Sequence, residues 1–150
     1  MTDMTGQNDR SRGLYRAFSL GLAMIFAAVG AIFLFLPRAT LAFFNAAGRR
    51  LGMAEGPADL SFFTSLAVAY MCIVTVLAWR MWRSPRERIY PLLLAQAKIA
   101  SSILSFALFA AAAPWLILLV NGIVDGGLGL VVLALYFRLK NGRPGRRAGA

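Results

Sequence analysis

The sequence predicts an all-α integral membrane protein: a four-helix transmembrane bundle with a short interfacial helix in the first, outer loop. Of its 150 residues, 59% are hydrophobic and 15% are charged, whereas an ordinary soluble domain has roughly 25% charged residues. The apolar residues gather in four runs long enough to cross about 30 Å of hydrocarbon, which takes about 20 helical residues. Almost all charged residues lie outside these runs, as in the loops of a membrane protein.

We place the spans at residues 14–36, 60–82, 89–113 and 115–137. The apolar stretch of the first span follows Arg10, Arg12 and Arg16, as a signal-peptide core would follow its basic region, but it is longer than the roughly 7–15 residues of such a core. We interpret it as a retained helix, with a cleaved signal peptide as the alternative. The expected organisation is a cytoplasmic N-terminal tail (1–13), a transmembrane domain (14–140) and a disordered basic tail (141–150).

The basic residues are divided unevenly between the two sides of the membrane. Three lie before or at the start of the first span, four lie in or next to the second loop and five in the tail, so twelve of the 16 Lys and Arg fall on the side of the termini. The first loop contributes only three, Arg38, Arg49 and Arg50. The positive-inside rule therefore predicts an inner-membrane protein with both termini in the cytoplasm.

The net charge of +10 does not indicate a nucleic-acid-binding protein, because it comes from short basic blocks between apolar runs. Such blocks suit anionic lipid headgroups at the cytoplasmic face. The chain has no histidine and a single cysteine, Cys72. Most zinc, haem and copper sites need these ligands, so we expect no metal and no cofactor.

The outer loop, residues 37–59, contains a second helical pattern. Pro37 ends the first span, and Leu41, Phe44 and Leu51 recur at helical intervals, with Gly48 as the expected stop. This pattern predicts a short helix lying in the membrane interface, with an ordinary connecting loop as the alternative. Residues 52–59 are expected to form an exposed turn.

Two ionisable residues, Lys98 and Asp125, lie deep inside the third and fourth spans. Pro114 joins these spans almost directly, so they are expected to be antiparallel neighbours with the two charges at similar depth. Helical spacing adds a polar seam of Ser101, Ser102, Ser105 and Asn121, and a close-packing face of Gly122, Gly126 and Gly129. The pair either fixes helix register or serves a ligand, proton or substrate, and both interpretations stay open.

Two other patterns concern helix association. Gln96 lies about 200° around the third span from Lys98, so it faces elsewhere, where interhelical hydrogen bonding is its expected role. In the first span, small residues every four positions are expected to form a close-packing face: Ser19, Ala23, Ala27 and Ala31.

The layout resembles the DoxX-like family of small bacterial four-helix membrane proteins. The likeness is carried by Pro37, the Leu-Ala-Phe-Phe-Asn stretch at 41–45, the basic second loop and the Asn-Gly-Ile-Val-Asp-Gly stretch at 121–126, and it covers most of residues 14–137. Some members of that family are small subunits of quinone-linked oxidoreductases. The resemblance transfers no functional residue to this chain.

The spans hold no phosphate-binding loop, nucleophile elbow or carboxylate pair. We therefore expect a non-catalytic membrane protein, either an accessory subunit or a bundle that binds lipid, another membrane protein or further copies of itself. The alternative is a small proton-coupled transporter that uses Lys98 and Asp125. An enzyme acting on lipid or quinone is the third interpretation.

The predicted topology can be measured with reporter fusions. A reporter fused after residue 150 should be active in the cytoplasm, and one inserted near residue 54 should be active outside, because the twelve basic residues keep their side in the cytoplasm. The same answer from both fusions would rule out the four-span topology.

Overall fold

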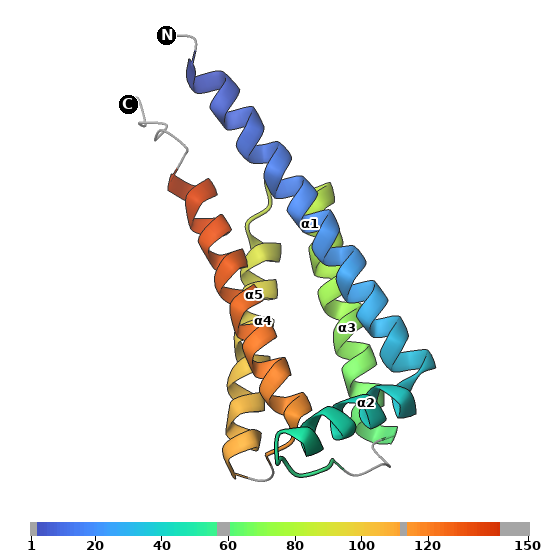
Figure 1. Cartoon of the computed structure of the whole chain (residues 1–150). Helices are drawn as coiled ribbons and strands as arrows, with labels where there is room; N and C mark the ends of the chain where they lie inside the picture. The colour runs from blue at the N-terminus through green and yellow to red at the C-terminus, as the bar shows by residue number, and fades with distance from the viewer. Residues whose placement is uncertain (1–2, 57–60, 112–113, 142–150) are drawn as a thin grey trace.

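The computed structural model describes residues 3–56, 61–111 and 114–141. Its helices are α1 (Asp3–Phe35), α2 (Pro37–Arg50), α3 (Ser61–Arg83), α4 (Ile89–Ala111) and α5 (Leu116–Asn141). The four long helices run side by side, and α2 lies across one end of them (Figure 1). The predicted all-α bundle of four long helices and one short helix is confirmed.

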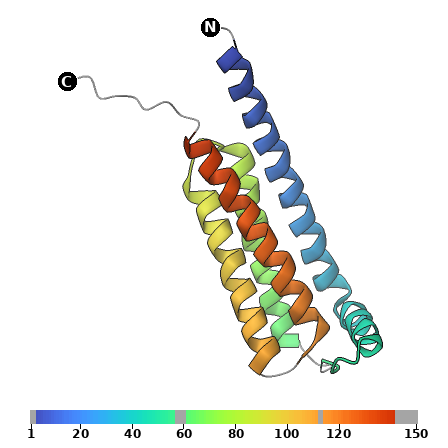
Figure 2. The ribbon, with the colours of Figure 1, turned by 60° about the vertical axis from the view of Figure 1, so that its left-hand side comes forward.

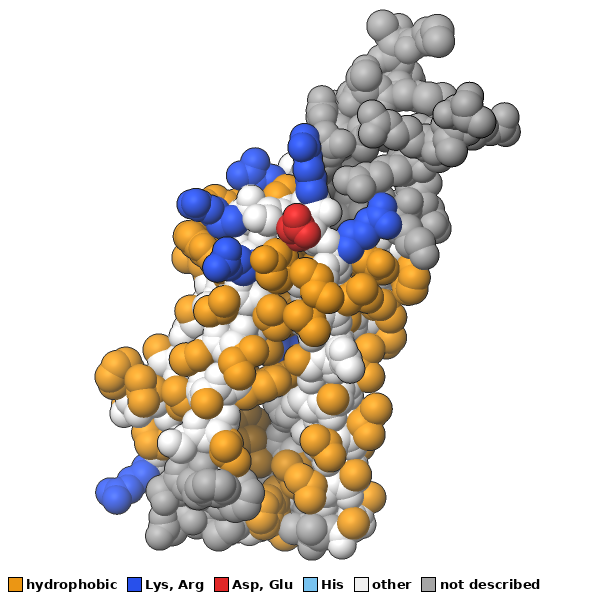
Figure 3. Space-filling view, turned by 180° about the vertical axis from the view of Figure 1, so that it is seen from behind, with side chains coloured by type: hydrophobic (Ala, Val, Ile, Leu, Met, Phe, Trp, Pro, Cys, Tyr) orange, Lys and Arg blue, Asp and Glu red, His pale blue; other side chains and the backbone are white. Residues whose placement is uncertain are grey.

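Four segments are long and apolar enough to cross a membrane: Gly13–Phe35, Thr64–Arg83, Ile89–Ala111 and Leu116–Arg138. Large apolar side chains cover their outer faces. One isoleucine in each of these four segments is more than half exposed: Ile25 (56%), Ile73 (59%), Ile103 (62%) and Ile123 (59%). On the face drawn in Figure 3, hydrophobic side chains cover the middle, and most of the Lys and Arg gather at one end. The protein is therefore a multi-pass membrane protein.

The spans pack as two pairs, α1 with α3 and α4 with α5, and a smaller contact between α3 and α4 joins the pairs. Each of the four spans contributes side chains to one buried core, including Phe26, Val74, Leu94 and Val132. The α1–α3 contact is close at Gly30, where a Cβ atom would lie 3.1 Å from the Cβ of Met71. The absence of a side chain at Gly30 lets the two backbones approach.

The predicted close-packing face of α1 is only half right. Ser19 and Ala23 are buried, but Ala27 and Ala31 are exposed. A step of four residues turns a helix by about 400°, so each step moves about 40° off the starting face. The buried face instead continues through Phe26 to Gly30.

The turn from α1 into α2 is set by Pro37, the first residue of α2. A residue before proline is pushed out of the helical region, and Leu36 has φ −129° and ψ 42°. At the other end Gly52 takes φ +70°, while its N–H donates to Arg49 O and that of Met53 donates to Gly48 O. This is a Schellman cap.

The prediction that Gly48 stops this helix is therefore wrong. α2 continues to Arg50, and Gly52 provides the stop because it can adopt a positive φ without steric cost. Gly48 is buried instead, where a Cβ atom would lie 3.5 Å from the Cβ of Leu116 at the start of α5.

The segment after α2 is held against it by Asn45. The Asn45 side chain donates to Gly56 O at 2.9 Å and accepts from Gly56 N at 3.0 Å. Gly56 is buried, with a Cβ position 3.6 Å from the Trp115 ring. Residues 52–55 are mostly exposed as expected, but Gly56 is not, and residues 57–59 lie outside the described part.

α1 is longer than its span. It begins at Asp3, so most of the expected tail over 1–13 continues the same helix, which projects beyond its neighbours (Figure 2). The start of α1 and the end of α5 lie at the same end of the bundle, opposite α2 (Figure 1). Of the expected tail over 141–150, only Asn141, the last residue of α5, is described.

The packing of α4 on α5 predicts that replacement by alanine will lower the stability of the bundle at one glycine of α5 and not at another. A Cβ at Gly129 would lie 2.8 Å from Ile99 Cγ1 and 3.3 Å from Ala95 O, whereas one at Gly127 meets nothing within 4 Å. Gly129→Ala should cost about 1–3 kcal/mol through overpacking. Gly127→Ala, the matched control, adds the same methyl group and should be neutral or slightly stabilising. Reversible unfolding in mixed micelles measures both, and equal stability of the two variants would contradict this packing.

Candidate functional site

Lys98 and Asp125 form an ion pair near the middle of their spans. Lys98 Nζ donates to Asp125 Oδ1 at 2.7 Å, and the two side chains are only 1% and 3% exposed. Lys98 is the largest of the fully buried side chains in the described part of the chain. Either charge alone would cost about 2.5–3.5 kcal/mol at the centre of a membrane helix, so each needs the other in this position.

The ammonium group also faces two aromatic rings from the other pair of helices. Lys98 Nζ lies 4.5 Å from the centre of the Phe26 ring on α1 and 5.0 Å from that of Tyr70 on α3. Both distances are within the range of cation–π attraction, which strengthens when the cation is desolvated. The Lys98 ammonium of α4 is therefore in contact with groups from the three other spans.

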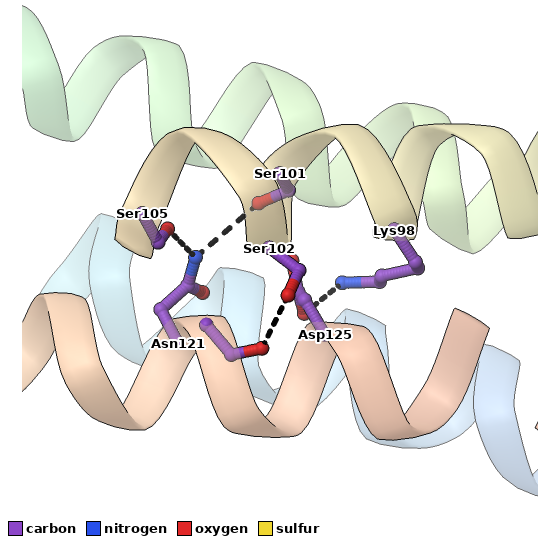
Figure 4. A network of polar contacts seen from close by, with 7 residues as sticks. Lys98, Ser101, Ser102, Ser105, Asn121 and Asp125 are labelled. Atoms are coloured by element: carbon purple, nitrogen blue, oxygen red, sulfur yellow. Dashed lines mark hydrogen bonds and ion pairs between the residues drawn. The ribbon is translucent and has the colours of Figure 1, made fainter. Parts of the chain in front are cut away.

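A row of hydrogen bonds continues the α4–α5 contact along the seam (Figure 4). Ser102 Oγ donates to Gly122 O at 2.7 Å. The Asn121 amide lies 3.2 Å from Ser101 Oγ and 2.8 Å from Ser105 Oγ, and donates to both. The polar residues of this face of α4 are thus all engaged with α5.

The glycines of α5 let these bonds form. A Cβ at Gly126 would lie 2.7 Å from Ser102 Oγ, and one at Gly122 would lie 3.0 Å from the Phe106 ring. Gly129 meets Ile99 in the same way. The three glycines therefore line the α4 contact, and a side chain at Gly126 would displace the hydroxyl that donates to Gly122 O.

Two buried polar atoms have no hydrogen-bond partner among the described residues: Asp125 Oδ2 and the Tyr70 hydroxyl oxygen. The hydroxyl lies near Asp125 and Ser101. Burying a carboxylate oxygen or a phenol without a hydrogen bond is costly.

The structure brings together all the residues expected for the site, and it adds Phe26 and Tyr70, which the sequence did not assign to it. Phe26 gave no signal, because a phenylalanine in an apolar run is indistinguishable from core packing. Tyr70 is a polar-tipped residue inside an apolar span, which is a weak signal for a buried partner.

Comparisons with protein families, with curated proteins and with solved structures find no match for this chain. Inference about its function therefore depends on the geometry of its own residues.

The ion pair predicts a double-mutant pattern. Removing one partner of a buried pair typically costs about 3–5 kcal/mol, because the other charge is left uncompensated. Lys98→Met or Asp125→Asn alone should therefore lower the free energy of unfolding and the yield in membranes, and the combined variant should recover much of the loss.

The measurement is reversible unfolding of the four chains in the same micelles. If the double variant is as unstable as the worse single variant, the two residues do not stabilise the bundle as a pair.

Proposed function

We propose that this protein is a non-catalytic membrane bundle that acts by binding, as an accessory subunit of a membrane protein assembly or as a lipid- or protein-binding module. One observation carries the proposal. Lys98 and Asp125, the charged residues deep inside its described spans, are the default candidates for chemistry, and they are 1% and 3% exposed and bonded to each other. They stabilise contacts between helices and are closed to any substrate approaching from lipid.

The outer surface supports the same proposal. Basic side chains are exposed at the junction of α3 and α4, including Arg80, Arg83, Arg86 and Arg88. This is also the end at which the chain enters α1 and leaves α5 (Figure 1). The positive-inside rule favours the cytoplasmic side for this end, where the arginines would bind anionic headgroups. The DoxX-like layout favours an accessory subunit.

A second candidate, a small proton-coupled transporter, is favoured by the unpaired Asp125 Oδ2 and Tyr70 hydroxyl. These atoms could carry a proton if the helices opened around them. Such a transporter would need Asp125 itself, whereas a binding module needs only the shape of the bundle.

The Lys98→Met/Asp125→Asn double variant separates the two functions. Purified gently from membranes, wild type and double variant should retain the same stoichiometric membrane protein or lipid, as identified by mass spectrometry, because the pair only supports the fold. In vesicles with a pH gradient, the two should show equal proton leak. A proton flux in wild type that the folded double variant lacks would reject the binding module and establish the carrier.

A further inference from the structure

Gln96 is a strongly polar residue that α4 directs away from the bundle. It lies two residues before Lys98, hence about 200° around the helix, and its side chain is exposed. It takes no part in the described hydrogen bonds between α4 and α5, which come from Ser102 and Asn121. On the outer face of a span, that exposure is to hydrocarbon, where an unpaired amide costs several kcal/mol.

Gln96 also lies too deep to reach water. It is seven residues from Ile89, the start of α4, which corresponds to about 10 Å at about 1.5 Å per residue. Lys and Arg escape from such depths on long stems, but the glutamine side chain is shorter. Its hydrogen bonds must therefore come from another group inside the membrane.

The surface around Gln96 suits a helix. An open groove runs along α4 beside Leu133 of α5, with Leu93, Gln96, Ala100 and Ile103 among its lining residues. Exposed residues follow a four–three spacing through this groove and beyond it: Ile89, Leu93, Gln96, Ala100, Ile103, Ala107 and Ala110. This is the heptad spacing of a coiled-coil seam, and its alanines permit close backbone approach.

We propose that this seam is the interface with a second copy of the chain. An amide is both donor and acceptor, so two glutamines can form reciprocal hydrogen bonds across a two-fold axis. Copies with the same membrane orientation place their α4 helices parallel and both Gln96 residues at equal depth. A lipid tail offers no hydrogen bond, and an unrelated helix would need a polar group at this same depth. One polar residue in an apolar seam also fixes register.

The proposal goes beyond the binding function above, and the two can fail separately. Loss of an accessory partner in gentle purification says nothing about self-association, and a monomeric chain can still bind a partner. The self-association test therefore uses the purified full chain alone, labelled and reconstituted in phosphatidylcholine vesicles at a series of protein-to-lipid ratios, with energy transfer between copies as the readout.

Wild type should form a dimer whose fraction rises with the protein-to-lipid ratio. Gln96→Leu should raise the dissociation constant between about three-fold and thirty-fold, from the loss of two interhelical hydrogen bonds. Gln96→Asn keeps the amide and should retain most of the affinity. Ile123→Ala, an equally lipid-facing change on α5, should have no effect.

Cysteine cross-linking tests the same interface without changing Gln96. In a Cys72→Ser background, Ala100→Cys should form disulfide-linked dimers under oxidation and Ile123→Cys should not. A wild-type chain that stays monomeric at every ratio would overturn the proposal. So would a dimer that is insensitive to Gln96→Leu, or one cross-linked through Ile123→Cys and not through Ala100→Cys.

Discussion

The ammonium group of Lys98 is the point on which the arrangement of the four spans depends. A cation in hydrocarbon must be surrounded by groups that stabilise it, and here these come from three other helices: the Asp125 carboxylate and the rings of Phe26 and Tyr70. The contact between α3 and α4 is small beside the contacts within each helix pair. Lys98 therefore fixes how the two pairs meet, because moving either pair would expose its charge to the low dielectric of the core.

Around this charge, α4 and α5 pack through polar bonds and small residues, as membrane helices do where lipid is as apolar as any side chain. Ser102 reaches a backbone carbonyl of α5 only because Gly126 leaves room for its hydroxyl. The outer faces carry large apolar side chains instead. Gln96 is a polar residue on the outer face of α4, so this face differs from the apolar outer faces of the other spans.

Much of this arrangement follows from the sequence. Apolar run length predicts the four spans, and the spacing of Lys98, the serines and the glycines predicts which faces of α4 and α5 are in contact. Positions that depend on tertiary contacts were missed or wrong. The sequence indicates Gly48 as the end of α2, but the helix ends before Gly52, because the backbone requires a positive φ only after Arg50. Phe26 could not be assigned to Lys98, because an apolar run does not show which residue faces a charge 72 positions later.

The short connection at Pro114 has a consequence for biogenesis. α4 leaves the ribosome before α5, so Lys98 emerges before its counter-ion. A lone lysine at that depth is poorly tolerated in lipid. Because so few residues separate α4 from α5, the two can enter the bilayer as a single hairpin with both charges already neutralised. Lengthening this connection would delay the pairing, so the shortness of the turn matters for assembly as well as for the geometry of the finished bundle.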